Sequence, residues 1–130
     1  MKILIFGNPH LKEDNLAIKV CEYIKQQMPE QRLEFIEIKD TFQLLNENLE
    51  NSIVIDVVQN LEKVQIINPE QLKNSSIQTA HDFDAGFFIK LTKQKPRIIG
   101  IPQQGDVREI AEGVKLILNS IIPNQLLRNE

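Results

Sequence analysis

Residues 3–20, ILIFGNPHLKEDNLAIKV, contain the pattern that decides the fold class. A short apolar run ends at Gly7, which favours a buried strand over a helix fragment. From Asp14 to about Met28 the apolar residues recur at helical spacing, and the pattern stops before Pro29. The stretch therefore predicts a strand, a loop and a helix in that order, with a pair of adjacent acids at the junction.

The rest of the chain continues this alternation of strands and helices. Further strands are predicted at 32–38, 52–58, about 64–67 and in PRIIGIPQ, and further helices at 41–48, from about Asp82 and from about Asp106. The segment SIVIDVV is the most β-branched of these and is expected to be a central strand. Together the elements predict an α/β fold: a three-layer sandwich with a twisted, mostly parallel sheet of about five strands and helices on both faces.

Length and composition limit the class of protein. A chain of 130 residues with 42% apolar and 25% charged residues is typical of one globular domain, expected over residues 1–130. No segment approaches the roughly 18 continuous apolar residues of a membrane span, and no secretory signal pattern is present, so we expect a cytoplasmic protein without membrane contact. The net charge of −3 without a basic block disfavours nucleic acid as a partner.

The single cysteine lies within the first predicted helix. Cys21 falls among Val20 and Ile24, and its near neighbours in sequence include no histidine or cluster of bases that would lower a thiol pKa. We expect a small buried thiol here rather than a redox or nucleophilic group.

Three polar residues are candidates for chemistry because of where they fall relative to the predicted strands. Asp14 follows the first strand, Asp56 interrupts the apolar strand at 52–58, and His81 opens a helix after a long polar segment. In parallel sheets the carboxyl ends of the strands share one edge, where functional residues gather. Carboxylate oxygens with an imidazole nitrogen suit a divalent transition ion such as zinc, nickel or iron, so the three form a candidate metal set.

Each candidate also has a purely structural interpretation. Asp14 suits a helix N-cap, Asp56 suits a carboxylate that accepts backbone hydrogen bonds, and His81 suits an exposed first-turn residue. The spacing of the three is much less specific than a compact metal-binding signature. In PQQGDVRE, Gly105 and Asp106 precede a helix N-terminus that could hold an anion, although a turn and a cap explain these residues equally well.

The order of four segments resembles one known family. These are ILIFGNPHLKEDNLAIKV, IVIDVV, TAHDFDAGFFIKL and RIIGIPQQGD, and in this order they resemble the hydrogenase maturation proteases, endopeptidases that trim the C-terminus of the large subunit of nickel-iron hydrogenases. The resemblance covers nearly the whole chain. It implies a twisted, mostly parallel sheet between helices, in agreement with the pattern of strands and helices.

The resemblance also implies a site and a partner. The metal-contacting residues of the family fall on Asp14, Asp56 and His81 of this chain. By this resemblance they are the catalytic and metal-contacting residues, the nickel arrives in the substrate, and zinc could substitute for it. The implied partner is the large subunit of a nickel-iron hydrogenase. We expect this chain to act as a monomer.

The chain departs from the family pattern in its glycines, which leaves two rival hypotheses open. Asn15 and Ala17 follow the acidic pair where the family carries glycine, and EIKDTFQLL lacks the glycines that usually follow the second strand. One rival is a non-catalytic relative that binds a maturation partner without cutting it. The other is a small α/β module that binds an anion at helix N-termini.

Overall fold

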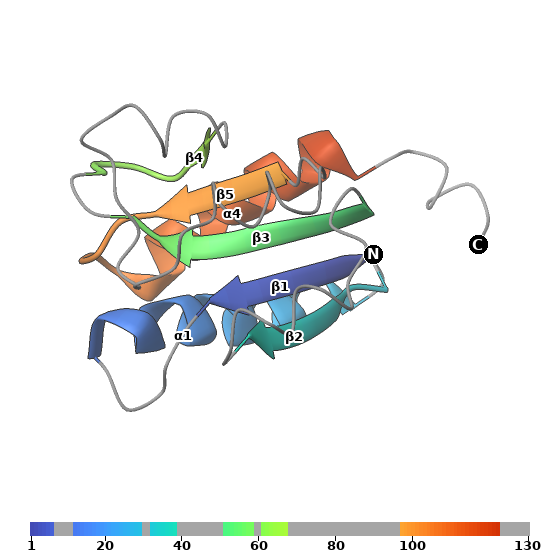
Figure 1. Ribbon diagram of the computed structural model, residues 1–130, viewed down its shortest axis with the longest axis horizontal. Helices are drawn as coiled ribbons and strands as arrows, with labels where there is room; N and C mark the ends of the chain where they lie inside the picture. Colours follow the sequence, from blue (N-terminus) through green and yellow to red (C-terminus); the bar gives the residue numbers. More distant parts are fainter. Residues whose placement is uncertain (7–11, 30–31, 39–50, 59–60, 68–96, 123–130) are drawn as a thin grey trace, which may run out of the picture.

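Five strands and two α-helices make up the part of the chain that the computed structural model describes, residues 1–6, 12–29, 32–38, 51–58, 61–67 and 97–122 (Figure 1). Their bounds are β1 (Lys2–Phe6), α1 (Lys12–Gln27), β2 (Glu34–Ile38), β3 (Ser52–Val57), β4 (Gln65–Ile67), β5 (Arg97–Ile101) and α4 (Val107–Ile121). Each of the five strands corresponds to a predicted one.

The strands form one mostly parallel sheet in the order β2-β1-β3-β5-β4. β1 pairs in parallel with β2 and β3, β3 pairs in parallel with β5, and only β4 runs antiparallel, along the outer side of β5. All six residues of β3 are buried, which confirms it as the central strand predicted from its β-branched composition. The α/β class and the mostly parallel five-stranded sheet are therefore as predicted.

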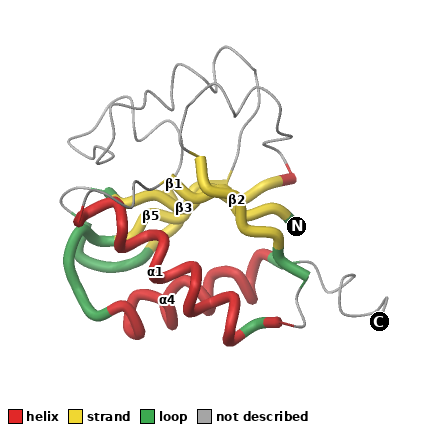
Figure 2. The backbone as a smooth tube through the Cα atoms, turned by 90° about the horizontal axis from the view of Figure 1, so that it is seen from below, coloured by secondary structure: helices red, strands yellow, loops and turns green. Residues whose placement is uncertain are grey.

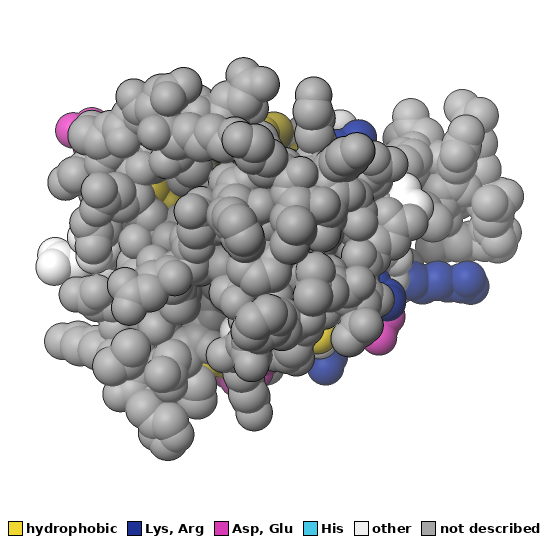
Figure 3. Space-filling view, viewed as in Figure 1, with side chains coloured by type: hydrophobic (Ala, Val, Ile, Leu, Met, Phe, Trp, Pro, Cys, Tyr) yellow, Lys and Arg dark blue, Asp and Glu magenta, His cyan; other side chains and the backbone are white. Residues whose placement is uncertain are grey.

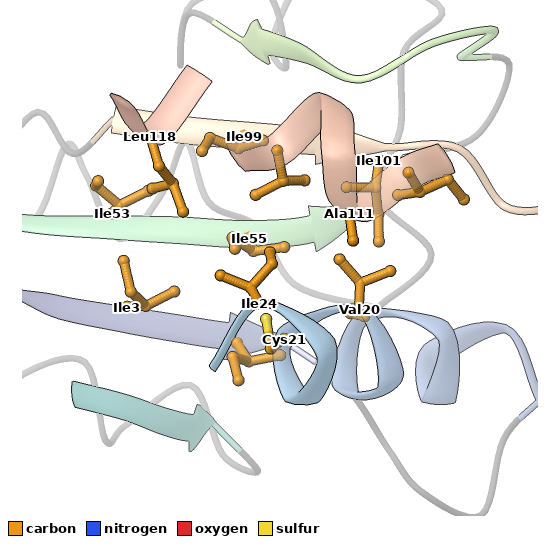
Figure 4. Packing of buried hydrophobic residues seen from close by; sticks show 14 of the residues in the cluster. Ile3, Val20, Cys21, Ile24, Ile53, Ile55, Ile99, Ile101, Ala111 and Leu118 are labelled. Atoms are coloured by element: carbon orange, nitrogen blue, oxygen red, sulfur yellow. The ribbon is translucent and has the colours of Figure 1, made fainter. Parts of the chain in front are cut away.

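Both described helices pack on the same face of the sheet (Figure 2). Alternate strand residues meet the apolar stripes of α1 and α4 there and form the helix-side core. Figure 4 shows its centre, in which Cys21 and Ile24 of α1 lie against Ile55 of β3. Other members that the figure labels are Ile3, Val20, Ile53, Ile99, Ile101, Ala111 and Leu118.

The opposite face of the sheet is also apolar and buried. A second group of buried side chains, called here the far-side core, consists of Leu4, Ile38, Val54, Val58, Ile67 and Ile98. In the space-filling view of Figure 3 the described hydrophobic side chains appear only as small, separate yellow patches. Burial on both faces agrees with the three-layer prediction, while the helices expected at 41–48 and from Asp82 fall outside the described residues.

The last helix begins where its capping residue predicts. The Asp106 side chain accepts a hydrogen bond from the backbone N–H of Arg108 at 2.8 Å, and Gly105 before it has a φ of 147°. A turn and an N-cap thus explain GDV, as the structural interpretation proposed.

Neither of the α-helices among the described residues is long and apolar enough to cross a bilayer.

The first helix begins earlier than predicted. α1 starts at Lys12, so Asp14 is its third residue and lies inside the helix. The interpretation of Asp14 as an N-cap is wrong, because a capping residue precedes the first helical residue. The apolar period could not reveal this start, since the first helical turn contributes no apolar residue to the pattern.

Candidate functional site

The carboxyl ends of three parallel strands meet at one edge of the sheet. The register places Ile5 of β1 beside Ile55 of β3, and Val57 of β3 beside Ile101 of β5. Both α1 and α4 begin at this edge, on the left in Figure 1. In open α/β sheets this is the edge at which ligands bind, because the connections that leave the strands converge there.

Asp56 is the carboxylate that β3 brings to this edge. It is the fifth of the six residues of β3 and its side chain is only 2% exposed. Because strand residues alternate between faces, Asp56 shares a face with Val54 and Val58 of the far-side core and points away from α1 and α4. Burying a carboxylate costs more free energy than burying an apolar side chain, so packing alone does not account for an acid here.

The neighbour of Asp56 on β5 is a glycine. Asp56 and Gly100 are register partners in the parallel β3–β5 pair. A Cβ built at Gly100 would overlap Cδ1 of Ile67 and would lie 3.1 Å from Cδ2 of Leu61. The place of a side chain beside Asp56 is therefore taken by methyl groups that arrive from β4 and from the segment before it.

The other two predicted site residues are placed only in part. Asp14 lies in the first turn of α1, which begins at the same edge of the sheet as the carboxyl end of β3. The side chain of Asp14 and the whole of His81 fall outside the described residues. The structure thus brings the backbone of Asp14 and the side chain of Asp56 to one edge, and the three-residue site stays a prediction.

The described residues contain no group of three histidine, cysteine or acidic side chains that could bind a metal ion, a search that covers neither His81 nor the Asp14 side chain. At the functional edge the described part supplies the buried carboxylate of Asp56 and, at the start of α4, the exposed carboxylate of Asp106. Carboxylate oxygens are donors that divalent transition ions accept. Asp56 therefore has donor atoms suited to one ligand of the metal site predicted from the sequence.

Cys21 is outside this edge and is packed in the helix-side core. Its side chain is 2% exposed. Burial raises the pKa of the thiol well above its ordinary value, and the nearby acids Glu22 and Glu37 raise it further. A thiol held neutral in this way is a poor nucleophile, as the sequence pattern indicated.

The fold as a whole is similar to a known one. The solved structure of the hydrogenase maturating endopeptidase HybD from E. coli matches this chain with a TM-score of 0.59 and 14% sequence identity, covering 92% of this chain and 91% of that one. No protein-family profile matches the sequence, and no curated protein is similar to it in sequence. At this identity the likeness is one of fold, and it confirms the fold that the resemblance in the sequence implied.

Sequence reasoning missed the surroundings of Asp56. A glycine inside an apolar strand often marks the close approach of another group, so Gly100 carried a usable signal. Ile67 carried none, because only the antiparallel pairing of β4 with β5 brings it over Gly100.

Proposed function

We propose that this protein is an endopeptidase that removes the C-terminal tail of the nickel-loaded large subunit of a nickel-iron hydrogenase during maturation. The observation that carries the proposal is Asp56, a carboxylate buried at the functional end of the central strand. Two further observations support it. The fold matches that of a hydrogenase maturating endopeptidase over nine-tenths of both chains, and the four sequence segments that resemble the family occur in the family's order.

In this proposal Asp14, Asp56 and His81 bind the nickel that the substrate carries. A carboxylate, or a water polarised by the bound ion, then assists attack on the scissile carbonyl. Asp56 belongs to a strand that pairs with β1 on one side and β5 on the other, so little conformational entropy is lost when its carboxylate engages the substrate. Asp14 contributes from the start of α1, where the partial positive charge of the helix favours an ionised carboxylate.

The test is tail removal by variants that alter one proposed ligand at a time. Asp56→Asn and His81→Ala are expected to fold normally and to leave the tail of a nickel-loaded large subunit in place, because each loses one ligand. The measurement is the mass of the large subunit after incubation with each variant. Asp106→Asn is the matched control: it makes the same chemical change at an exposed carboxylate near the same edge and keeps a residue that caps α4.

Normal processing by Asp56→Asn or by His81→Ala contradicts the proposal. If instead the wild-type protein copurifies stoichiometrically with an intact large subunit and never shortens it under any metal condition, the non-catalytic relative is the correct hypothesis. If phosphate or nucleotides raise its thermal stability and nickel-loaded large subunit is neither bound nor cut, the anion-binding module is favoured.

A further inference from the structure

Asp56 has an immediate neighbour on β5 that lacks a side chain. Paired residues on adjacent parallel strands present their side chains on the same face, with the strands about 4.8 Å apart. The partner of Asp56 is Gly100, so position 100 is the nearest site on β5 from which a side chain could contact the carboxylate.

The space above Gly100 is filled from another strand. Ile67, at the end of β4, is 1% exposed and places Cδ1 where a Cβ of residue 100 would stand. Leu61 adds a second methyl group at the same place, since its Cδ2 lies 3.1 Å from that Cβ position. Gly100 thus serves to admit these methyl groups rather than to provide backbone flexibility: its φ is not in the left-handed region, which among the described glycines only Gly105 adopts.

We propose that Gly100 and Ile67 are positioning residues for Asp56, an inference that rests on the proposed function. The methyl group of Ile67 over Gly100 places apolar atoms at the β5 position beside the carboxylate and limits the access of water from that side. In this way the two residues orient the carboxylate toward the edge of the sheet, where the substrate's nickel would bind. The apolar surroundings of a ligand control solvent access, and changes in the groups that support a ligand typically alter metal affinity by about 10-fold or more.

β4, which is antiparallel to β5, holds Ile67 in place over Gly100. β4 has only three residues, and its register with β5 places Gln65 beside Gly100 and Ile67 beside Ile98. The side chain of Ile67 must therefore extend along the sheet from position 98 toward position 100 to cover the glycine. A one-residue shift of β4 would turn Ile67 to the other face and leave the position beside Asp56 open.

The experiment uses the full chain and Ni²⁺ alone as the probe, with binding measured by calorimetry and folding by thermal denaturation. Ile67→Ala removes the methyl group over Gly100. Ile38→Ala is the matched control: it makes the same deletion in the same far-side core, on β2, with β1 between it and β3. Both variants are expected to lower the melting temperature, because both remove buried apolar atoms. Only Ile67→Ala is expected to weaken Ni²⁺ binding, by about 10-fold.

The outcomes separate this inference from the proposed function. If Asp56→Asn abolishes Ni²⁺ binding while Ile67→Ala binds as tightly as wild type, the positioning role is wrong and the proposed function stands. Equal weakening by Ile67→Ala and Ile38→Ala also overturns it, because the effect then belongs to packing in general. If wild type shows no Ni²⁺ binding that depends on Asp56, the inference and the proposed role of Asp56 fail together.

Ile67→Val keeps the test decisive if Ile67→Ala does not fold. This variant removes only Cδ1, the atom that a Cβ at Gly100 would overlap. It is expected to weaken Ni²⁺ binding more than Ile38→Val does. Equal affinities for the two valine variants overturn the positioning role.

Discussion

Cys21 illustrates how burial sets the chemistry of a single residue. Desolvation in the helix-side core raises the pKa of its thiol, with Glu22 and Glu37 as smaller contributors. The sequence indicated the outcome, because the residue lies on the apolar stripe of a helix. The size of the effect depends on three-dimensional contacts, since Glu37 belongs to β2 and is distant in sequence.

The raised pKa of Cys21 predicts a loss of stability at alkaline pH. Above about pH 8.5 the unfolded chain releases the thiol proton while the folded chain retains it, so the free energy of unfolding falls as pH rises, by at most about 1.4 kcal/mol per pH unit from this group. Cys21→Ala is expected to show a shallower fall between pH 8 and 10, measured by urea denaturation. Identical pH dependence of the two proteins would contradict the prediction.

For Asp56, the sequence predicted an unusual buried acid but not the side chains that surround it. An acid in a β-branched strand was recognisable as unusual from sequence alone, and the structure places it buried at the carboxyl end of β3. The sequence did not reveal that Ile67 lies over Gly100, the register partner of Asp56, because Ile67 and Gly100 are 33 positions apart in the sequence.

At the scale of elements, α4 packs closely on the segment before β4. At one position of the helix this contact disfavours the larger side chain that helix propensity would favour. Gly113 is in the interior of α4, where alanine is normally favoured by about 1 kcal/mol. A Cβ there would lie 3.2 Å from both Cβ and Cγ2 of Val64, closer than ordinary contact. Val64 is β-branched and cannot easily turn these atoms away.

We therefore expect Gly113→Ala to destabilise the protein despite the better helix propensity. In a background carrying Val64→Ala, the same change is expected to cost less free energy of unfolding, because the contact at Cγ2 is gone while the contact at Cβ remains. The measurement is a double-mutant cycle of unfolding free energies in urea. Additive effects of the two substitutions would show that Gly113 and Val64 do not compete for space.

α4 has a buried face and an exposed face, and substitutions on the two faces are expected to change the free energy of unfolding by different amounts. Leu118 is fully buried, whereas Leu116 is 72% exposed on the same helix. Leu118→Ala is expected to lower the free energy of unfolding by about 2–5 kcal/mol through the lost contacts and the cavity. Leu116→Ala, the matched control, is expected to change it by less than about 0.5 kcal/mol. Similar losses in both variants would contradict the assigned faces.

At the scale of the whole molecule, β3 links the two cores. Ile53, Ile55 and Val57 belong to the helix-side core, while Val54 belongs to the far-side core. If either core unfolds, β3 is no longer held in place for the other core, because β3 contributes side chains to both.

This shared strand predicts cooperative, two-state unfolding. Calorimetric and van't Hoff enthalpies of thermal unfolding are expected to agree, as they do for most single domains of this size. The measurement is differential scanning calorimetry, with far-UV circular dichroism as a second probe. Two resolved transitions would show that the cores unfold separately.

The sequence by itself determined the strands, the two described helices to within a few residues, the parallel α/β class and the candidate acids. These follow from periodicity, β-branching, glycine and proline, which act over a few neighbouring residues. Only the tertiary structure decided the antiparallel pairing of β4, the face to which Asp56 points and the cover that Ile67 provides over Gly100. These depend on register and on side chains from distant segments competing for one space, and no local pattern encodes that competition.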